Sequence, residues 1–136
     1  MSTQLPAPEP IVNPDTEQFW AATKEGILLV QRCQSCGQAI WSPRALCPAC
    51  HSDQLEMSEA SGRGTIYSYS VVSKGMGEYA GIGSYVLAYV ELEEGPRVMT
   101  NIVEADPAAL QVGDAVEVVF SPAGEHGALP RFRPAG

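Results

Sequence analysis

Four cysteines, the only four in the chain, stand in two pairs, Cys33-x-x-Cys36 and Cys47-x-x-Cys50. A C-x-x-C segment forms a tight knuckle that directs two sulfur atoms at one point, and two knuckles supply four thiolates in a tetrahedron. This is the ligand set of a closed structural zinc site, in which no coordination position is left for a reacting water molecule. The spacing therefore predicts a metal-stabilised module and argues against metal catalysis at these residues.

Three other uses of the cysteines are weaker or remain open. Two disulfides would need an oxidising compartment, and the polar N-terminus carries no pattern of an export signal. A thioredoxin-like redox pair would stand near a βαβ pattern, which the sequence lacks. Iron in a rubredoxin-like site would use the same four ligands, and the spacing does not distinguish it from zinc. His51 adjoins Cys50, but we expect a surface histidine because four thiolates already complete the coordination shell.

Composition and charge favour a globular domain and disfavour nucleic acid as its partner. The 136 residues are 45% hydrophobic and 18% charged, and no apolar run approaches the ~20 residues of a membrane helix. The formal net charge is −8 and the eight basic residues are scattered, whereas a nucleic-acid binder normally carries a basic patch. Arg97, Arg131 and Arg133 are the candidates for such a patch in the folded chain. With no export signal, we expect a cytoplasmic protein with reduced cysteines.

Residues 14–56 are predicted to form an N-terminal helix followed by the zinc ribbon, after a flexible arm at 1–13. The segment 13–15 supplies a capping asparagine, a proline suited to the first turn and an acid at the positive end of the helix dipole. A ribbon this small buries too little apolar surface to fold alone, so we expect the metal to supply the missing stability. Phe19 and Trp20 have two interpretations that the sequence leaves open: core packing, or an exposed anchor for a partner.

Residues 57–136 are predicted to form a barrel. Alternating apolar and polar residues, bounded by glycine, proline and acidic turns, predict five strands. These strands are expected at 65–72, 85–92, 97–103, 115–120 and 128–132. One helical turn is expected at 106–110, between the third and fourth strands, and this order suits a partly open OB barrel. In the first strand, Tyr67 and Tyr69 are expected on one face, and the glycine-rich segment 74–84 is expected to be a flexible loop.

The ordered set of segments resembles the acyl-CoA-associated family of rubredoxin-like zinc-ribbon/OB-fold proteins. In the ribbon half the resemblance rests on Phe19-Trp20, Glu25-Gly26, Gln31-Arg32-Cys33, Cys36-Gly37, Pro43-Arg44, Cys47-Pro48 and Cys50. In the barrel half it rests on Gly62-Arg63-Gly64-Thr65-Ile66-Tyr67-Ser68-Tyr69, Gly95-Pro96-Arg97-Val98-Met99-Thr100-Asn101-Ile102-Val103, Gly113-Asp114 and Leu129-Pro130-Arg131-Phe132. The match runs from Asp15 to Pro134, and its specificity lies in the order of the segments.

The resemblance implies a companion role in acyl-CoA chemistry. Members of the family accompany thiolase-fold enzymes that act on acyl-CoA thioesters, and in some complexes the OB half helps to hold the CoA moiety. The partners include thiolases and thiolase-like aldolases, among them lyases of steroid side-chain breakdown, and other members are paired with hydratase-type proteins. The resemblance therefore implies a subunit of a hetero-oligomer, with structural zinc and with acyl-CoA or CoA at the shared site.

The residues themselves reveal no independent catalytic site, so we expect no catalysis by this chain alone. Neither His51 nor His126 stands in a triad pattern, and the acids at 93–94 are expected to form a solvated corner. The alternative function is a free-standing zinc-ribbon/OB module that binds nucleic acid, which the negative charge disfavours. A third is an electron carrier with iron at the four thiolates.

Overall fold

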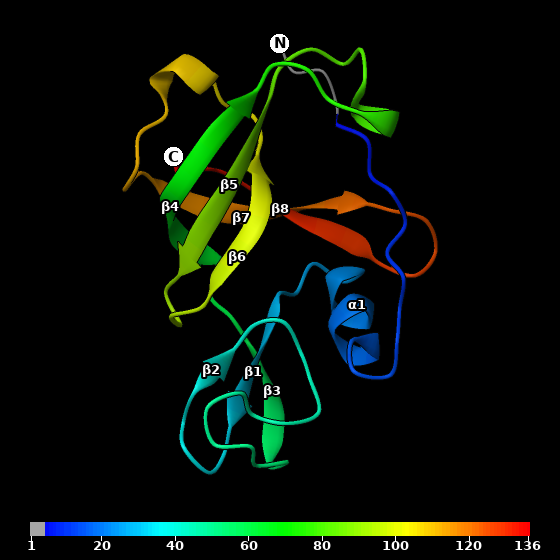
Figure 1. The fold of residues 1–136 in the computed structure, drawn as a ribbon, viewed down its shortest axis with the longest axis vertical. Helices are drawn as coiled ribbons and strands as arrows, with labels where there is room; N and C mark the ends of the chain where they lie inside the picture. The colour runs from blue at the N-terminus through cyan, green and yellow to red at the C-terminus, as the bar shows by residue number, and fades with distance from the viewer. Residues whose placement is uncertain (1–4) are drawn as a thin grey trace.

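The computed structural model describes residues 5–136 and consists mainly of β-strands. A short helix, α1 (Glu17–Thr23), precedes a small sheet and a barrel (Figure 1). The small sheet contains β1 (Leu29–Cys33), β2 (Ala39–Ile40) and β3 (Leu55–Glu59). The barrel contains β4 (Arg63–Val72), β5 (Tyr85–Leu92), β6 (Arg97–Ile102), β7 (Ala115–Pro122) and β8 (Ala128–Pro134). The predicted fold class is confirmed: an N-terminal helix, a cysteine ribbon and a five-stranded OB-fold barrel.

Helix α1 begins after an asparagine turn and is fastened to the barrel near its end. The Asn13 side chain accepts hydrogen bonds from the backbone N–H groups of Asp15 (3.0 Å) and Thr16 (3.1 Å), which orders the chain just before the first helical residue. The chain leaves the helix through Gly26, whose φ of +76° is one that glycine adopts easily. The Thr23 hydroxyl accepts the backbone N–H of Ala128 at 3.0 Å, so the helix is bound directly to β8.

The ribbon sheet has the order β2-β1-β3, and its third strand crosses the expected boundary at 56. Strand β3 pairs antiparallel with β1 over five residue pairs, from Leu29↔Glu59 to Cys33↔Leu55. The expected boundary between 56 and 57 therefore falls inside a strand that pairs with the ribbon, and the division of the chain at this point stays a prediction. The sequence of β3 carries two acids on an exposed strand, so its pattern did not distinguish it from a linker.

The barrel is closed in the order β4-β5-β6-β8-β7. Most neighbouring strands are antiparallel and pair over several residues. Strands β6 and β8 run parallel, and they pair at only one position, Ile102↔Phe132. The expected helical turn is confirmed as a 3-10 helix, η2 (Pro107–Ala109), capped by the Asp106 side chain. A second one, η1 (Gly77–Tyr79), lies in the glycine-rich segment that was expected to be a flexible loop.

The barrel and the N-terminal half share one hydrophobic core. Phe132, Ile66 and Val90 are at most 1% exposed inside the barrel, and Phe19 and Val30 from the helix and ribbon belong to the same cluster. A second, smaller cluster lies at the cysteine knuckles and consists of Cys33, Ile40 and Cys47, with Leu55 packed against it. The larger core therefore spans both halves of the chain.

A β-bulge in β4 changes the expected facing of its tyrosines. Ile66 pairs with Val90 and Ser68 pairs with Tyr89, so Tyr67 is the extra residue on β4. Tyr67 is 48% exposed on the outside of the barrel, whereas Tyr69 packs against the core. The prediction that Tyr67 and Tyr69 share a face is therefore wrong, because one inserted residue reverses the alternation.

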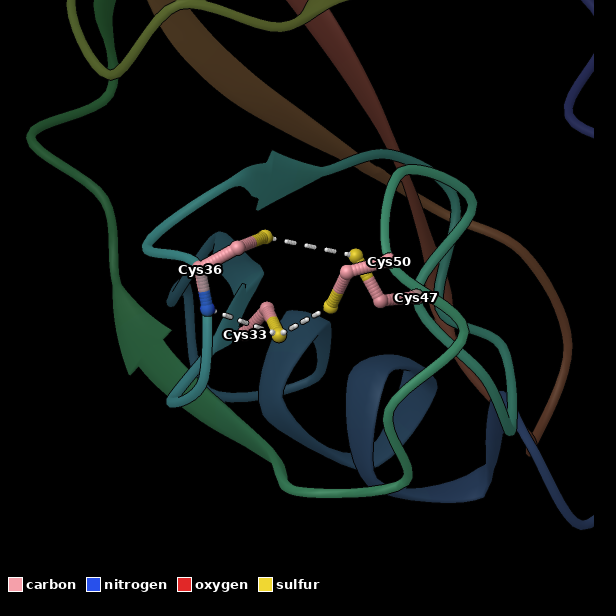
Figure 2. Close-up of side chains that lie close together, drawn as sticks. All are labelled: Cys33, Cys36, Cys47 and Cys50. Atoms are coloured by element: carbon pink, nitrogen blue, oxygen red, sulfur yellow. Dashed lines mark hydrogen bonds between the residues drawn. The ribbon is translucent and has the colours of Figure 1, made fainter.

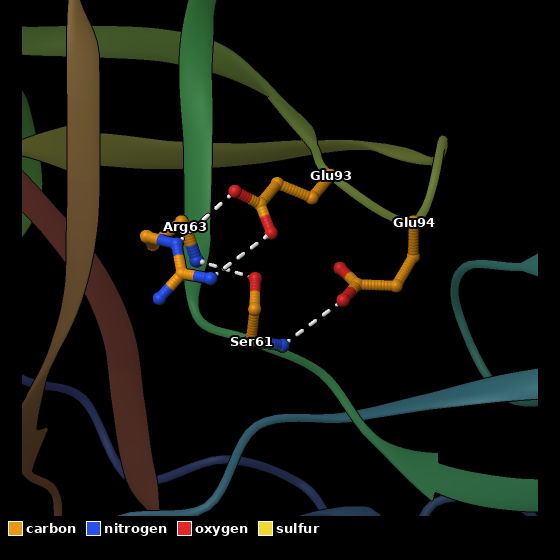
Figure 3. A network of polar contacts seen from close by, with 4 residues as sticks. All are labelled: Ser61, Arg63, Glu93 and Glu94. Carbon is orange, nitrogen blue, oxygen red and sulfur yellow. Dashed lines mark hydrogen bonds and ion pairs between the residues drawn. The ribbon is translucent and has the colours of Figure 1, made fainter.

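The joint between ribbon and barrel is held by the turn between β5 and β6 (Figure 3). Glu94 accepts the backbone N–H of Ser61 at 2.9 Å, and Glu93 pairs with Arg63 at 3.1 Å. The hydrogen bond from Arg63 lowers the pKa of Glu93. Gly62 has a φ of +81°, and a Cβ atom there would lie 2.7 Å from a Val118 methyl carbon, so any other residue would strain the linker. The acids at 93–94 were expected to form a solvated corner, but they bind residues 61–63, which link the ribbon to the barrel.

The described part of the N-terminal segment lies against the barrel. The Glu9 carboxylate accepts the backbone N–H groups of Glu125 (2.9 Å) and His126 (3.2 Å) and contacts the His126 ring. The carbonyl of Pro6 accepts hydrogen bonds from Arg131 and from the Tyr79 hydroxyl. The expected loose arm is therefore fastened at 5–13, and its first four residues lie outside the described range. Within 5–136, no helix is long and apolar enough to cross a membrane.

Candidate functional site

The four cysteines converge from two knuckles into one cluster (Figure 2). The Sγ atoms of Cys33 and Cys50 lie 3.6 Å apart, those of Cys36 and Cys47 lie 3.7 Å apart, and all four lie within 4.8 Å of one another. A tetrahedron with metal–sulfur bonds of about 2.3 Å has edges of about 3.8 Å. The sulfur positions therefore fit a tetrahedral S₄ ion, either zinc or the iron of a rubredoxin-like site.

Backbone geometry positions both knuckles in the same way. The N–H of Gly37 donates to the carbonyl of Cys33 at 2.9 Å, and the N–H of His51 donates to the carbonyl of Cys47 at 2.8 Å. Gly37 has a φ of +81° and His51 a φ of +65°, so His51 occupies the left-handed position that glycine fills in the first knuckle. His51 is exposed and ends its turn, and it does not belong to the group of potential ligands.

The protonation of the cluster is uneven. The backbone N–H of Cys36, 3.4 Å from Cys33 Sγ, lowers the pKa of Cys33 to about 6. The Ser52 N–H acts to lower the pKa of Cys50, but the sulfurs of Cys33, Cys36 and Cys47 outweigh it and raise that pKa to about 12. A metal ion needs all four groups as thiolates, so binding it must release protons.

One edge of the cluster faces solvent. Cys33 and Cys47 are buried, whereas Cys36 and Cys50 are exposed. All four protein ligands are present, so a bound ion would have no open position for a substrate. The arrangement suits structural stabilisation of the ribbon and gives no site for metal-assisted hydrolysis.

An apolar cavity of about 260 Å³ lies where helix, ribbon and barrel meet. Its walls come from segments far apart in the chain. They include Trp20 on α1, Leu28 before β1, Trp41 after β2, Met99 on β6, and Pro130 and Arg131 on β8. The cavity follows the sparsely paired junction of β6 and β8, where the Thr100 hydroxyl donates to the Pro130 carbonyl at 3.0 Å. Pockets between domains are common ligand sites, so this is the second candidate site.

Arg131 brings a buried cation to this cavity. Its side chain is 3% exposed, and it donates to the Ser121 hydroxyl (3.3 Å), the Tyr79 hydroxyl (3.4 Å) and the Pro6 carbonyl. These oxygens are formally neutral, and burial lowers the pKa of Arg131.

The candidate basic patch does not form. Arg97 pairs with Glu91, and Arg133 pairs with Glu104 and Glu117, so acids neutralise both of these arginines. The three arginines therefore do not present a free basic surface.

The two helix aromatics have different environments. Phe19 is 3% exposed and makes edge-to-face contacts with Trp20 (centroids 4.9 Å apart) and Trp41 (5.0 Å), which corresponds to the core interpretation. Trp20 is half-buried and lines the cavity. Phe19 thus leaves little surface for a partner, and a role of either residue in partner binding stays a prediction. Sequence reasoning missed the role of Trp41 and named Arg131 only as part of a basic patch, because no local pattern reveals that the two residues meet at a cavity in the folded chain.

Comparison with known families agrees with both halves of the structure. Residues 20–56 match the ChsH2 rubredoxin-like zinc ribbon domain, and residues 58–121 match the ChsH2 C-terminal OB-fold domain. A DUF35 domain-containing scaffold protein of Methanothermobacter thermautotrophicus is 43% identical over 97 residues, which cover 71% of this chain and 73% of that protein.

This chain belongs to the ChsH2-type (DUF35) zinc-ribbon/OB-fold family.

Two other relatives are named as subunits of acyl-CoA enzymes. A probable enoyl-CoA hydratase alpha subunit of Thermomonospora curvata is 37% identical over 94% of this chain, which spans 40% of that longer protein. Benzoylsuccinyl-CoA thiolase subunit BbsA of Thauera aromatica is 29% identical over 87% of this chain and 85% of its own length. In a solved structure described as Ltp2-ChsH2(DUF35) aldolase, a chain 36% identical to this one superposes with a TM-score of 0.82, covering 94% of this chain and all of that one.

Proposed function

We propose that this protein is a non-catalytic companion subunit of a thiolase-fold acyl-CoA enzyme, a thiolase or a retro-aldol lyase. It supports assembly with the enzyme and helps to hold the CoA or acyl part of the thioester. A steroid-derived acyl group is one candidate substrate, on family resemblance. The observation that carries the proposal is the match at TM-score 0.82 to the whole of a chain in the Ltp2-ChsH2(DUF35) aldolase.

The site chemistry supports a companion role. The four cysteines form a closed ligand set, and we propose structural zinc there, one ion per chain, with iron as the alternative. The two histidines are engaged elsewhere, His51 in the turn of a knuckle and His126 against Glu9. The chemical step would then belong to the partner.

The inter-domain cavity supports the proposed contribution to thioester binding. Its walls are mostly apolar side chains, as an acyl chain or pantetheine arm requires. Asn101 and Arg131 are among the polar residues that line it. A partner docked over the cavity would enclose a ligand between two subunits.

The test compares three preparations on a β-ketoacyl-CoA and a β-hydroxyacyl-CoA. They are this chain alone, a thiolase-fold acyl-CoA enzyme from the same organism, and a co-expressed mixture passed over a size-exclusion column. We expect no turnover by the chain alone, co-elution of the two proteins, and higher activity in the mixture than in the enzyme alone. Full activity in the enzyme alone, without co-elution, would refute the proposed function.

A further inference from the structure

The outer face of β4, β5 and β6 carries an apolar patch that is unusual for a solvent-facing sheet. Four side chains form it, and we call them the outer patch: Tyr67 (48% exposed), Leu87 (39%), Tyr89 (45%) and Met99 (61%). These fractions correspond to roughly 400 Å² of exposed surface, within the range of the largest patches on monomeric proteins, which are often functional. The patch therefore needs an explanation beyond scattered surface residues.

The strand register brings these residues together. Tyr89 stands directly opposite Met99 on β6, and opposite Ser68 on β4, while Leu87 stands opposite Ser70. The serines are small, so the aromatic and aliphatic side chains of β5 rise above them. Tyr89 and Met99 are therefore cross-strand neighbours, and Leu87 lies on the same face of β5 two residues before Tyr89. Tyr67 is joined to this group through Arg97, which stacks on its ring and lies two residues before Met99 on β6.

The sequence of β5 indicates that another molecule covers its outer face. Its inward residues Val86, Ala88 and Val90 are at most 3% exposed and fill the barrel. Of its outward residues, Leu87 and Tyr89 in the middle of the strand are also apolar and Glu91 near its end is charged, whereas a strand with one solvated face normally alternates apolar and polar residues throughout. A strand whose central residues are apolar on both faces is typical of one that is covered on both.

The charges around the patch favour a protein over nucleic acid. Arg97 is the cation beside it, and its guanidinium carbon lies 3.8 Å from the centre of the Tyr67 ring. The same arginine pairs with Glu91 at 3.1 Å, so the edge of the patch is locally neutral. Stacking aromatics bind single-stranded nucleic acid when a positive groove follows the backbone, and this chain has a net charge of −8.

The area and position of the patch favour an enzyme subunit over a second copy of this chain. A stable homodimer commonly buries 2,000 Å² or more in total, whereas a standard interface buries about 800 Å² per partner, so roughly 400 Å² suits the apolar centre of a standard interface. Met99 also lines the inter-domain cavity, so a protein bound to the patch would reach the cavity mouth.

We propose that the outer patch is the docking surface for the thiolase-fold subunit. This inference rests on the proposed function and assigns it a specific face. Tyr67 and Tyr89 are the aromatic anchors, Leu87 and Met99 complete the apolar centre, and Arg97 with Glu91 forms part of the polar rim. Docking there places partner atoms beside the cavity at the junction of β6 and β8.

The experiment measures the dissociation constant of the complex with the thiolase-fold enzyme used in the test of the proposed function, by biolayer interferometry. The test variant is Leu87→Thr/Tyr89→Thr, because threonine suits a strand and removes the apolar surface. The control is Met76→Thr, which removes an 84% exposed methionine outside the outer patch. We expect at least about a 30-fold weaker complex for the test variant, as losing an anchor side chain produces, and no change for the control. Hydrogen exchange of the wild-type complex should show new protection in β5 and β6, a result that does not depend on the variant folding.

The outcomes separate the docking surface from the proposed function. If wild type and test variant bind the enzyme equally, and β5 and β6 gain no protection, the docking surface is wrong and the companion role stands. If the wild type does not bind the enzyme, both are wrong. If the variant abolishes self-association of the free chain, or binding of single-stranded RNA, without weakening the enzyme complex, another occupant covers the patch and the inference is overturned.

Discussion

Replacing Phe19 with alanine should destabilise the protein by about 3–4 kcal/mol. The side chain is 3% exposed, so its loss forfeits about 2–3 kcal/mol of transfer free energy. It also loses two edge-to-face contacts, at 4.9 and 5.0 Å, each contributing about 0.5–1.5 kcal/mol. The adjoining cavity offsets part of the cost, because the new space opens into an existing one that neighbouring side chains can enter.

The assay is thermal unfolding of the metal-loaded protein, followed by circular dichroism. At about 3 °C per kcal/mol for a chain of this size, Phe19→Ala should melt about 10 °C below wild type. Trp20→Ala is the matched control on the same helix, and it should shift the midpoint less because Trp20 is only half-buried. A Phe19→Ala protein that melts within about 2 °C of wild type yet fails to bind the enzyme would refute the core role of Phe19 and support the anchor interpretation.

Three further predictions concern metal, nucleic acid and pH. Cys47→Ser should lower metal content, measured by plasma mass spectrometry, and chelation should unfold the ribbon before the barrel; a metal-free chain with unchanged thermal stability would contradict this. Fluorescence anisotropy at ~150 mM salt should detect no micromolar complex with single-stranded DNA or RNA, and a tighter one would overturn the reasoning from charge. The contact with His126 lowers the pKa of Glu9 below 4.5, so its stabilising effect is present above pH 4.5 and is lost as the pH falls through the folded-state value. The difference in melting temperature between wild type and Glu9→Gln should therefore disappear in acid, and a difference that persists would contradict the role of the Glu9 carboxylate.

Features encoded by local spacing were predictable from the sequence. The cysteine pairs needed only the geometry of a knuckle, and the five barrel strands followed from alternation bounded by turn residues. The helical turn at 106–110 carried its own capping residue, Asp106, next to a proline. In each case the pattern that predicts the element lies within a few residues along the chain, although the strands themselves pair over long distances in sequence.

Features created by distant contacts were not predictable. Strand β3 forms because it meets β1, and its own pattern of acids gives no strand signal. The N-terminal segment is fastened by Glu9 to a turn 116 residues away. The cavity joins Trp41 to Arg131, and the bulge at Tyr67 moves that residue to the outer patch. Local propensity predicts none of these features, because each depends on a contact with a residue that is distant in the sequence and comes close only when the chain folds.

The barrel is closed by few interactions at the junction between β6 and β8. They are the Ile102↔Phe132 pair, the hydrogen bond from the Val103 N–H to the Phe132 carbonyl (2.8 Å), and the hydrogen bond from the Thr100 hydroxyl to the Pro130 carbonyl. The diameter of the barrel can therefore change at this junction without a change of register between any other pair of strands. Side-chain substitutions at this one junction could resize the cavity while leaving the rest of the fold intact, which gives the scaffold a simple route to diversify the ligands it accommodates.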